Sequence, residues 1–296
     1  MRRRAGPLET VFVEVPEAAL DAYEAALATV CETVGFFLAD EEARTWRVEG
    51  VRDAGAGEDA LQGALALAAF ATGITAPLSR AATEAEGWLA RSGASFPEQP
   101  VGRRFTVRGT HLDGPGLPGR IALTLDAGLA FGSGEHGSTR GCLVALERVA
   151  RRRPRRILDL GAGSGILAVA AARLLRRPVL ATDIEPWAVR VTGENARLNG
   201  VARLVHPVLA DGWRSPRVRA GAPYDLVFAN ILARPLRRMA RDLALHLAPG
   251  GTAILAGLLD WQARGVLAAH RRHGLRLERA LQEGPWTTLV LRKGPA

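Results

Sequence analysis

An apolar strand that runs directly into a glycine-rich turn and then a helix constrains this chain more than any other feature. Residues 157–165 read Ile-Leu-Asp-Leu-Gly-Ala-Gly-Ser-Gly, and helical periodicity continues to about Leu175. Glycine allows the backbone to bend sharply and allows a ligand to lie against bare main chain. The segment therefore predicts a nucleotide-like cofactor, bound where a strand ends in an α/β domain.

The spacing of the glycines separates two classes of cofactor. Dinucleotide-binding turns follow Gly-x-Gly-x-x-Gly, a pattern that requires a small residue where this chain has Ile166. Gly161, Gly163 and Gly165 instead alternate, and Asp159 precedes them. This arrangement resembles the first motif of class I S-adenosylmethionine-dependent methyltransferases, whose turn accommodates the methionine portion and the ribose of the cofactor.

Two polar residues end later strands of the same predicted sheet. Asp183 closes the apolar run 179–183, where a carboxylate can accept hydrogen bonds from ribose hydroxyls. The alternative role for Asp183 is a turn or helix cap, because Pro186 follows shortly. Asn230 closes the run 225–230 and places a neutral polar group at the crevice in which ligands bind to such sheets.

A loop rich in glycine and hydroxyl groups spans residues 131–140, just before a helix that begins near Gly141. We expect this loop to cover the cofactor, because its glycines permit close approach and its hydroxyls offer contacts. A simple linker is the alternative, with Ser138 or Thr139 as the N-cap of the helix.

From Arg155 onward, strands and helices alternate, which predicts a doubly wound and largely parallel sheet covered on both faces. The expected strands are 156–160, 178–183, 204–209, 224–230 and 252–256. The expected helices are 164–175, 186–199, 235–247 and 261–273.

The N-terminal part has a different rhythm. Its pattern predicts strands at 10–15, 35–38, 45–51 and near Ile74, with helices at 17–30 and 58–70. A β-α-β-β-α-β order indicates a smaller ferredoxin-like α+β domain. We therefore expect a ferredoxin-like domain at 1–82, a linker region at 83–128 with strands at 104–107 and 121–125, and the catalytic domain at 129–296.

Charge and composition limit the classes of binding partner that we expect. The chain has 39 basic and 30 acidic residues, a net charge of +9, and Lys293 is its only lysine. Genome base composition explains such an arginine bias, so no specific nucleic acid is expected, and the basic run 151–156 is interpreted as a solvated loop. No segment is apolar enough to predict a membrane span.

Cysteine and histidine usage predicts neither a disulfide nor a metal site. Cys31 and Cys142 lie far apart without a second cysteine nearby, which fits a reducing cytoplasm. His270 and His273 have helical spacing but lack further ligands, so we expect a surface helix there.

Together these segments resemble the PrmA family, methyltransferases that modify large-subunit ribosomal protein eleven. The loop at 125–139 and the Asn-Ile-Leu segment at 230–232 carry the narrowest resemblance, and 247–251 and 257–259 resemble later family segments. Gly137 departs from the family pattern, because many relatives carry proline there, and this departure predicts a more mobile loop.

The resemblance implies transfer of methyl groups from S-adenosylmethionine to lysine side chains or the N-terminal amine of a large-subunit ribosomal protein. The implied cofactor contacts are Thr139, Gly161, Asp183 and Asn230, to which the glycine turn adds Gly163. Asn230 is also the candidate catalytic residue, because its side-chain oxygen can accept a hydrogen bond from the amine. The resemblance further assigns substrate recognition to the N-terminal domain, and we expect a monomer.

Three other functions compete with this interpretation. A nicotinamide-dependent dehydrogenase could share the architecture, but Ile166 argues against it. A noncatalytic RNA-binding protein would suit the net charge, but it leaves Gly161, Asp183 and Asn230 unexplained. A methyltransferase that acts on another protein or on RNA remains the alternative within the class.

Overall fold

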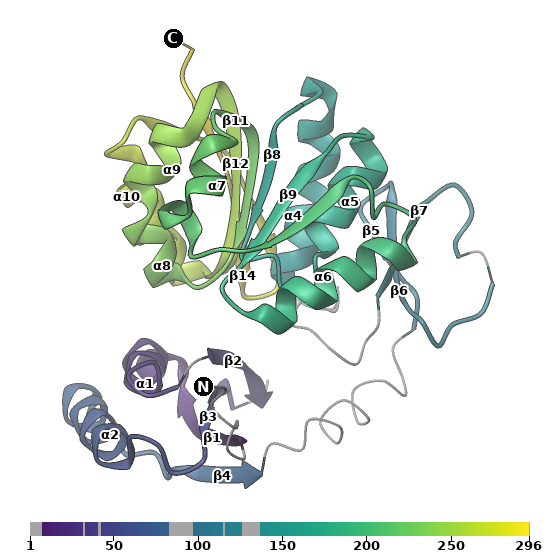
Figure 1. Cartoon of the computed structure of the whole chain (residues 1–296). Coiled ribbons are helices and arrows are strands. Elements are labelled where there is room, and N and C mark those ends of the chain that lie inside the picture. The colour runs from purple at the N-terminus through teal and green to yellow at the C-terminus, as the bar shows by residue number, and fades with distance from the viewer. Residues whose placement is uncertain are drawn as a thin grey trace, which may run out of the picture. The chain divides into compact units, whose positions relative to one another are not determined.

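The computed structural model describes residues 8–31, 33–40, 43–82, 97–114, 116–125 and 137–295. The chain divides into two compact units, Met1–Arg91 and Ser92–Ala296, both drawn in Figure 1. Among the described residues, no helix is both long and apolar enough to cross a membrane.

The first unit is an α+β domain. Its elements are β1 (Leu8–Pro16), the 3-10 turn η1 (Glu17–Ala19), α1 (Leu20–Leu27), β2 (Thr33–Asp40), β3 (Thr45–Asp53), α2 (Glu58–Thr72) and β4 (Ser79–Ala82). The strands form an antiparallel sheet in the order β2-β3-β1-β4, the arrangement of a ferredoxin-like domain. Val11, Val13 and Val15 are buried because alternate residues of a strand face the same side.

The last strand of this unit lies further along the chain than the sequence predicts. Instead of a strand near Ile74, the structure has an irregular stretch after Gly73, a left-handed residue that ends α2, and β4 begins at Ser79. The Tyr23 hydroxyl donates to the Ile74 carbonyl at 2.6 Å and accepts from the Ala76 N–H at 3.2 Å. A side chain of α1 thus satisfies backbone groups that a strand would have paired.

Within the second unit, a small sheet precedes the large one in the chain. It consists of β5 (Gln99–Val101), β6 (Phe105–Gly109) and β7 (Ile121–Leu125), and it contacts helices of the larger sheet. Asn199 joins the two parts, because its Oδ1 accepts from the Thr124 N–H at 2.9 Å and its Nδ2 donates to the Thr124 carbonyl at 2.6 Å. The region predicted as a linker, 83–128, therefore contains a sheet packed into the second unit.

The remaining strands form a doubly wound sheet. They are β8 (Ile157–Leu160), β9 (Val179–Asp183), β10 (Val205–Leu209), β11 (Tyr224–Asn230), β12 (Leu247–Leu259), β13 (Leu275–Glu283) and β14 (Trp286–Lys293). In the described part of the chain this sheet has seven strands, in the order β10-β9-β8-β11-β12-β14-β13. The first five strands in this order, β10, β9, β8, β11 and β12, are mutually parallel. β14 is antiparallel to both of its neighbours.

Helices cover both faces of this sheet (Figure 1). They are α4 (Gly137–Val149), α5 (Ile166–Leu175), α6 (Pro186–Leu198), α7 (Pro216–Ala220), α8 (Ala233–Arg238), α9 (Ala240–His246) and α10 (Asp260–Arg271). Leu226 and Phe228 of β11 pack in the core under α4 and α5, whereas Val227 and Ala229 pack in the core under α8 to α10. Burial of alternate β11 residues on opposite faces confirms the predicted doubly wound architecture.

Two features of this unit differ from the sequence prediction. The helix expected at 235–247 is two helices, α8 and α9, with Met239 between them. The hairpin of β13 and β14 was not predicted at all. β13 is an edge strand with mostly exposed or half-exposed residues, so its sequence lacks the apolar pattern that marks a buried strand.

Candidate functional site

The carboxyl ends of three neighbouring strands bring the predicted residues to one edge of the sheet. β8 lies between β9 and β11, with Leu160 paired to Thr182 on one side and to Ala229 on the other. Gly161 therefore lies between the ends of the strands that carry Asp183 and Asn230. The chain order reverses on the two sides of β8, and ligands bind at such a switch point in open α/β sheets.

The turn after β8 depends on glycine at each alternate position. Gly161, Gly163 and Gly165 have φ angles of +72°, +53° and +76°, a region that L side chains rarely adopt. A Cβ on Gly161 would lie 2.4 Å from Cγ2 of Ile231, and one on Gly165 would lie 2.8 Å from Cγ2 of Thr192. The turn thus packs closely against Ile231 and Thr192, and no glycine side chain covers its backbone atoms.

Asp183 connects the end of β9 to this turn. Its Oδ2 accepts from the Gly163 N–H at 2.9 Å, and its Oδ1 accepts from the Glu185 N–H at 3.0 Å. The structural role considered for Asp183 is therefore present, although the N-cap of α6 is Glu185. Each carboxylate oxygen has two acceptor sites, so Asp183 keeps acceptor capacity for a ligand hydroxyl.

Thr139 and Asn230, which are 91 residues apart, meet in the structure. The Nδ2 of Asn230 donates to the Thr139 Oγ1 at 3.4 Å, and Thr139 is fully buried on α4. This contact uses the amide nitrogen of Asn230 and leaves its oxygen as an acceptor. Thr139 therefore orients Asn230 here. The remainder of the predicted cofactor-covering loop, residues 131–136, lies outside the described residues.

Close packing between α4 and the hairpin of β13 and β14 sets the position of Thr139. A Cβ on Gly137 would lie 2.6 Å from the Glu283 carbonyl oxygen, and one on Gly141 would lie 2.2 Å from Oγ1 of Thr288. Gly137, read from the sequence as a source of mobility, thus allows the first turn of α4 to approach the hairpin. The sequence does not reveal this support, because the hairpin itself is not predicted from it.

Asp159 is a further polar residue beneath the turn. It is 1% exposed, and its Oδ2 accepts from the Ala168 N–H of α5 at 2.9 Å. Its Oδ1 is buried and has no hydrogen-bond partner among the described residues. Burial raises the pKa of the Asp159 carboxyl to about 7, although the Ala168 hydrogen bond opposes that shift. The motif gave the position of Asp159, but only the structure reveals its isolation from water.

The two histidines expected on a surface helix differ in their exposure to solvent. His273 is exposed, but His270 is buried at the end of α10, with Nδ1 2.9 Å from the Val266 carbonyl. Burial lowers the pKa of His270 and favours its neutral form. No group of three or more potential metal ligands occurs within the described ranges.

The donor set at this edge fits S-adenosylmethionine. A bare turn offers room and backbone groups, Asp183 offers acceptors for ribose hydroxyls, and the orphaned oxygen of Asp159 lies beneath the turn. Carboxylates also favour a cofactor that carries a sulfonium and an ammonium group over one that carries a pyrophosphate.

The raised pKa of Asp159 predicts a pH dependence of stability. A carboxyl whose pKa is 3.8 when exposed and about 7 when folded binds a proton in the folded state that the unfolded state releases. The free energy of unfolding should therefore fall as the pH rises from about 4 to about 7. In Asp159→Asn this fall should be smaller, as measured by urea denaturation across that range. The exposed Asp211→Asn is the control, and identical profiles for Asp159→Asn and the unmodified chain would contradict the assignment.

Comparison with known proteins gives the chain its family. The family model described as ribosomal protein L11 methyltransferase (PrmA) matches residues 38–294. The chain is 47% identical over 211 residues to a ribosomal protein L11 methyltransferase of Bradyrhizobium diazoefficiens, covering 71% of each chain. It is 46% identical to one of Rhodopseudomonas palustris, covering 79% of this chain and 80% of the relative.

A solved structure agrees with this match. The crystal structure of a ribosomal protein L11 methylase from Lactobacillus delbrueckii subsp. bulgaricus superposes with a TM-score of 0.61 and 29% identity. It covers 67% of this chain and 100% of the solved chain. The family and the fold are therefore those of methyltransferases that use S-adenosylmethionine. This chain belongs to the ribosomal protein L11 methyltransferase (PrmA) family.

Proposed function

We propose that this protein transfers methyl groups from S-adenosylmethionine to amino groups of ribosomal protein L11. The observation that carries the proposal is the meeting of the glycine turn, Asp183 and Asn230 at the ends of three adjacent strands. Family membership supports the ribosomal substrate. Lysine side chains and the N-terminal amine are the groups that we expect to be methylated.

In this proposal, Gly161 and Gly163 lie against the cofactor, and the Asp183 carboxylate accepts hydrogen bonds from its ribose hydroxyls. Thr139 on α4 is fully buried, so in this proposal it serves the site through its hydrogen bond with Asn230. Ile184 follows Asp183 directly and is 60% exposed, so an apolar surface is available where the base beyond the ribose would lie. This candidate contact was missed in the sequence because an exposed isoleucine is unremarkable until its place beside Asp183 is known.

Methyl transfer requires an uncharged amine aligned with the methyl carbon. A lysine amine has a reference pKa of about 10.4, so it must lose a proton before it attacks. The Asn230 oxygen can accept a hydrogen bond from the amine and hold its nitrogen in line, while Thr139 fixes the amide. Positioning is then the main contribution of the protein, and the bound cofactor supplies the methyl group.

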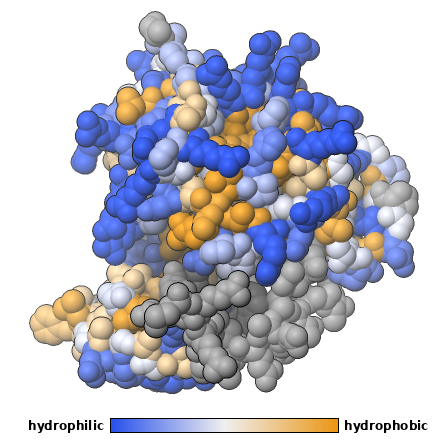
Figure 2. Space-filling view, viewed as in Figure 1, coloured by the Kyte–Doolittle hydropathy of each residue, from blue (hydrophilic) through white to orange (hydrophobic). Residues whose placement is uncertain are grey.

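We assign substrate recognition to the first unit. All the proposed cofactor contacts lie in the second unit, whereas α2 exposes two large apolar side chains, Leu67 (68% exposed) and Phe70 (87% exposed). Residues three apart lie on the same side of a helix, so these two form one surface. Figure 2 shows hydrophobic residues on the outer side of α2. Such a surface suits a protein partner.

We also place the reaction in the cytoplasm, carried out by a monomer. Cys31 and Cys142 are both free thiols, as suits a reducing compartment. Both faces of the large sheet are covered by helices of the same chain, so its core requires no partner subunit.

Replacing Asp183 tests the cofactor contact. Asp183→Ala should weaken S-adenosylmethionine binding by about 1.5–3 kcal/mol, because hydrogen bonds to a charged acceptor are lost. Isothermal titration calorimetry measures the effect, with Asp242→Ala, at an exposed residue of α9, as the control. Unchanged affinity in Asp183→Ala would leave this residue only its structural hydrogen bonds.

Asn230→Ala should lower turnover by about tenfold or more while changing cofactor affinity much less, because the amine contact matters most in the transition state. Steady-state methylation of purified ribosomal protein L11 gives the turnover, and calorimetry gives the cofactor affinity on the same preparation. Equal losses in both quantities would reassign Asn230 to cofactor binding alone.

Two changes to the first unit test its recognition role. In the full chain, the double variant Leu67→Ser/Phe70→Ser should raise the KM for ribosomal protein L11 without changing the affinity for S-adenosylmethionine. Leu245→Ser, at a residue of α9 that is 70% exposed, is the matched control.

A shortened chain that begins at Thr83 should still bind the cofactor but fail to methylate the intact protein. Methylation by the shortened chain at the full-length rate would refute the recognition role.

A further inference from the structure

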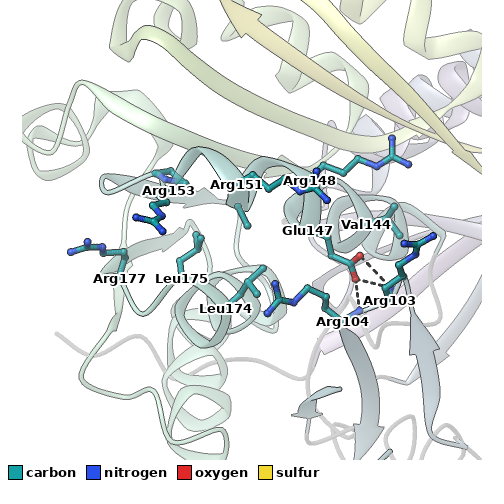
Figure 3. A pocket seen from close by; sticks show the side chains of 13 residues that line it. Arg103, Arg104, Val144, Glu147, Arg148, Arg151, Arg153, Leu174, Leu175 and Arg177 are labelled. Atoms are coloured by element: carbon teal, nitrogen blue, oxygen red, sulfur yellow. Dashed lines mark hydrogen bonds between the residues drawn. The ribbon is translucent and has the colours of Figure 1, made fainter. Parts of the chain in front are cut away.

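A cavity of about 890 Å³ lies in the second unit, away from the candidate active site (Figure 3). Pro154, which precedes β8, and Arg177, which precedes β9, both line it. It therefore lies at the amino ends of these strands, whereas Gly161 and Asp183 lie at their carboxyl ends. The four residues of β8 alone separate the two ends by roughly 13 Å.

Arginine dominates the lining of this cavity. The six arginines are contributed by the turn before β6, the end of α4, the 3-10 turn η2 (Ala150–Arg152) with the residue after it, and the loop before β9: Arg103, Arg104, Arg148, Arg151, Arg153 and Arg177. Figure 3 shows them around one hollow together with Leu174 and Leu175. Segments distant in the sequence thus converge on the same concave surface.

The acidic residues near these arginines are engaged elsewhere. Glu147 is the one carboxylate of the lining, and it accepts from the backbone N–H groups of Arg103 and Arg104 at 2.9 and 2.7 Å. Asp225 likewise accepts from the backbone N–H groups of Arg155 and Arg156, at 2.8 and 2.9 Å. Both carboxylates therefore hold backbone in place, and neither is ion-paired with an arginine of the cavity.

Within the described ranges, none of the six guanidinium groups has a hydrogen bond or an ion pair. Arg152 provides a contrast from the same basic run, because it pairs with Glu278 and donates to Thr252 Oγ1 at 2.8 Å. Arginine bias in the genome explains why lysine is rare, but it does not explain why the arginines that face the cavity lack acidic partners. Uncompensated like charges on a concave surface repel one another and attract a polyanion.

We propose that this cavity binds the phosphate backbone of RNA without sequence preference. Guanidinium groups form bidentate hydrogen bonds to phosphate, and contacts to phosphate position a nucleic acid without reading its bases. The lining contains no aromatic side chain on which a base could stack, which favours backbone contacts. The choice of RNA rests on the proposed function, because the proposed substrate is a protein that assembles on ribosomal RNA.

From the sequence, the run 151–156 is interpreted as a solvated loop and no specific nucleic acid is expected, whereas the cavity supports binding without sequence preference. The run alone does not show that Arg103, Arg104 and Arg177 join it around one cavity. Because the cavity and the active site are at opposite ends of the strands, RNA binding leaves the cofactor edge free.

The test is the binding of a fluorescent RNA hairpin of mixed sequence to the full chain, measured by anisotropy over a series of salt concentrations. The cavity variant is Arg104→Ala/Arg151→Ala/Arg177→Ala. The control variant, Arg217→Ala/Arg241→Ala/Arg271→Ala, removes the same charge from exposed positions of α7, α9 and α10. The cavity variant should bind about tenfold or more weakly, with a slope of log K against log salt reduced by about two, and the control should bind nearly as the unmodified chain does.

Equal losses in the two variants, or no RNA binding by the unmodified chain, would overturn the proposal. The proposal would also be overturned if the chain bound polyglutamate instead of RNA and the cavity variant lost that binding. Such a result would identify an acidic protein as the partner. Methylation of free ribosomal protein L11 without RNA is measured in parallel and should be unchanged in the cavity variant. If only the cavity variant lost this methylation, the cavity would be a site for the protein substrate. If the unmodified chain did not methylate ribosomal protein L11 at all, the proposed function would be refuted, and the RNA-binding result would be judged separately.

Discussion

The hydrogen bond from the Gly163 N–H to the Asp183 carboxylate is the contact on which the arrangement of the site depends. It joins the turn after β8 to the end of β9, while Gly161 donates from the same turn to the Thr182 carbonyl at 2.8 Å. Positive φ angles at the glycines make this geometry accessible. These hydrogen bonds fix the turn against the end of β9, and preorganisation of this kind lowers the cost of binding a ligand.

The other half of the site depends on a different contact. Close approach of α4 to the hairpin of β13 and β14, permitted by Gly137 and Gly141, places Thr139 where it can accept from Asn230. The substrate-positioning role that we propose for Asn230 thus depends on an edge of the sheet that lies far from the glycine turn in strand order. Substitutions in the hairpin should disturb the amine site before they disturb the cofactor turn.

Short-range patterns predicted most of the fold and much of the candidate site. The strand, turn and helix at 157–175 and the polar ends of β9 and β11 are local features, and each can be read from residue order. Features that depend on distant contacts could not be read in this way. The Tyr23 contact that replaces a strand at Ile74, the pairing of the exposed edge strand β13, the burial of Asp159 and the convergence of arginines from separate segments all require the folded chain.

Transfer of a methyl group to the ribosomal protein is the central claim, and mass spectrometry of the substrate tests it most directly. Purified ribosomal protein L11 is incubated with the full chain and with S-adenosylmethionine that carries an isotopically labelled methyl group. The account predicts mass increases in whole multiples of one labelled methyl group less the hydrogen that it replaces, located by peptide fragmentation on lysine side chains or the N-terminal amine. An unmodified substrate, under conditions in which calorimetry shows the cofactor bound, would contradict it.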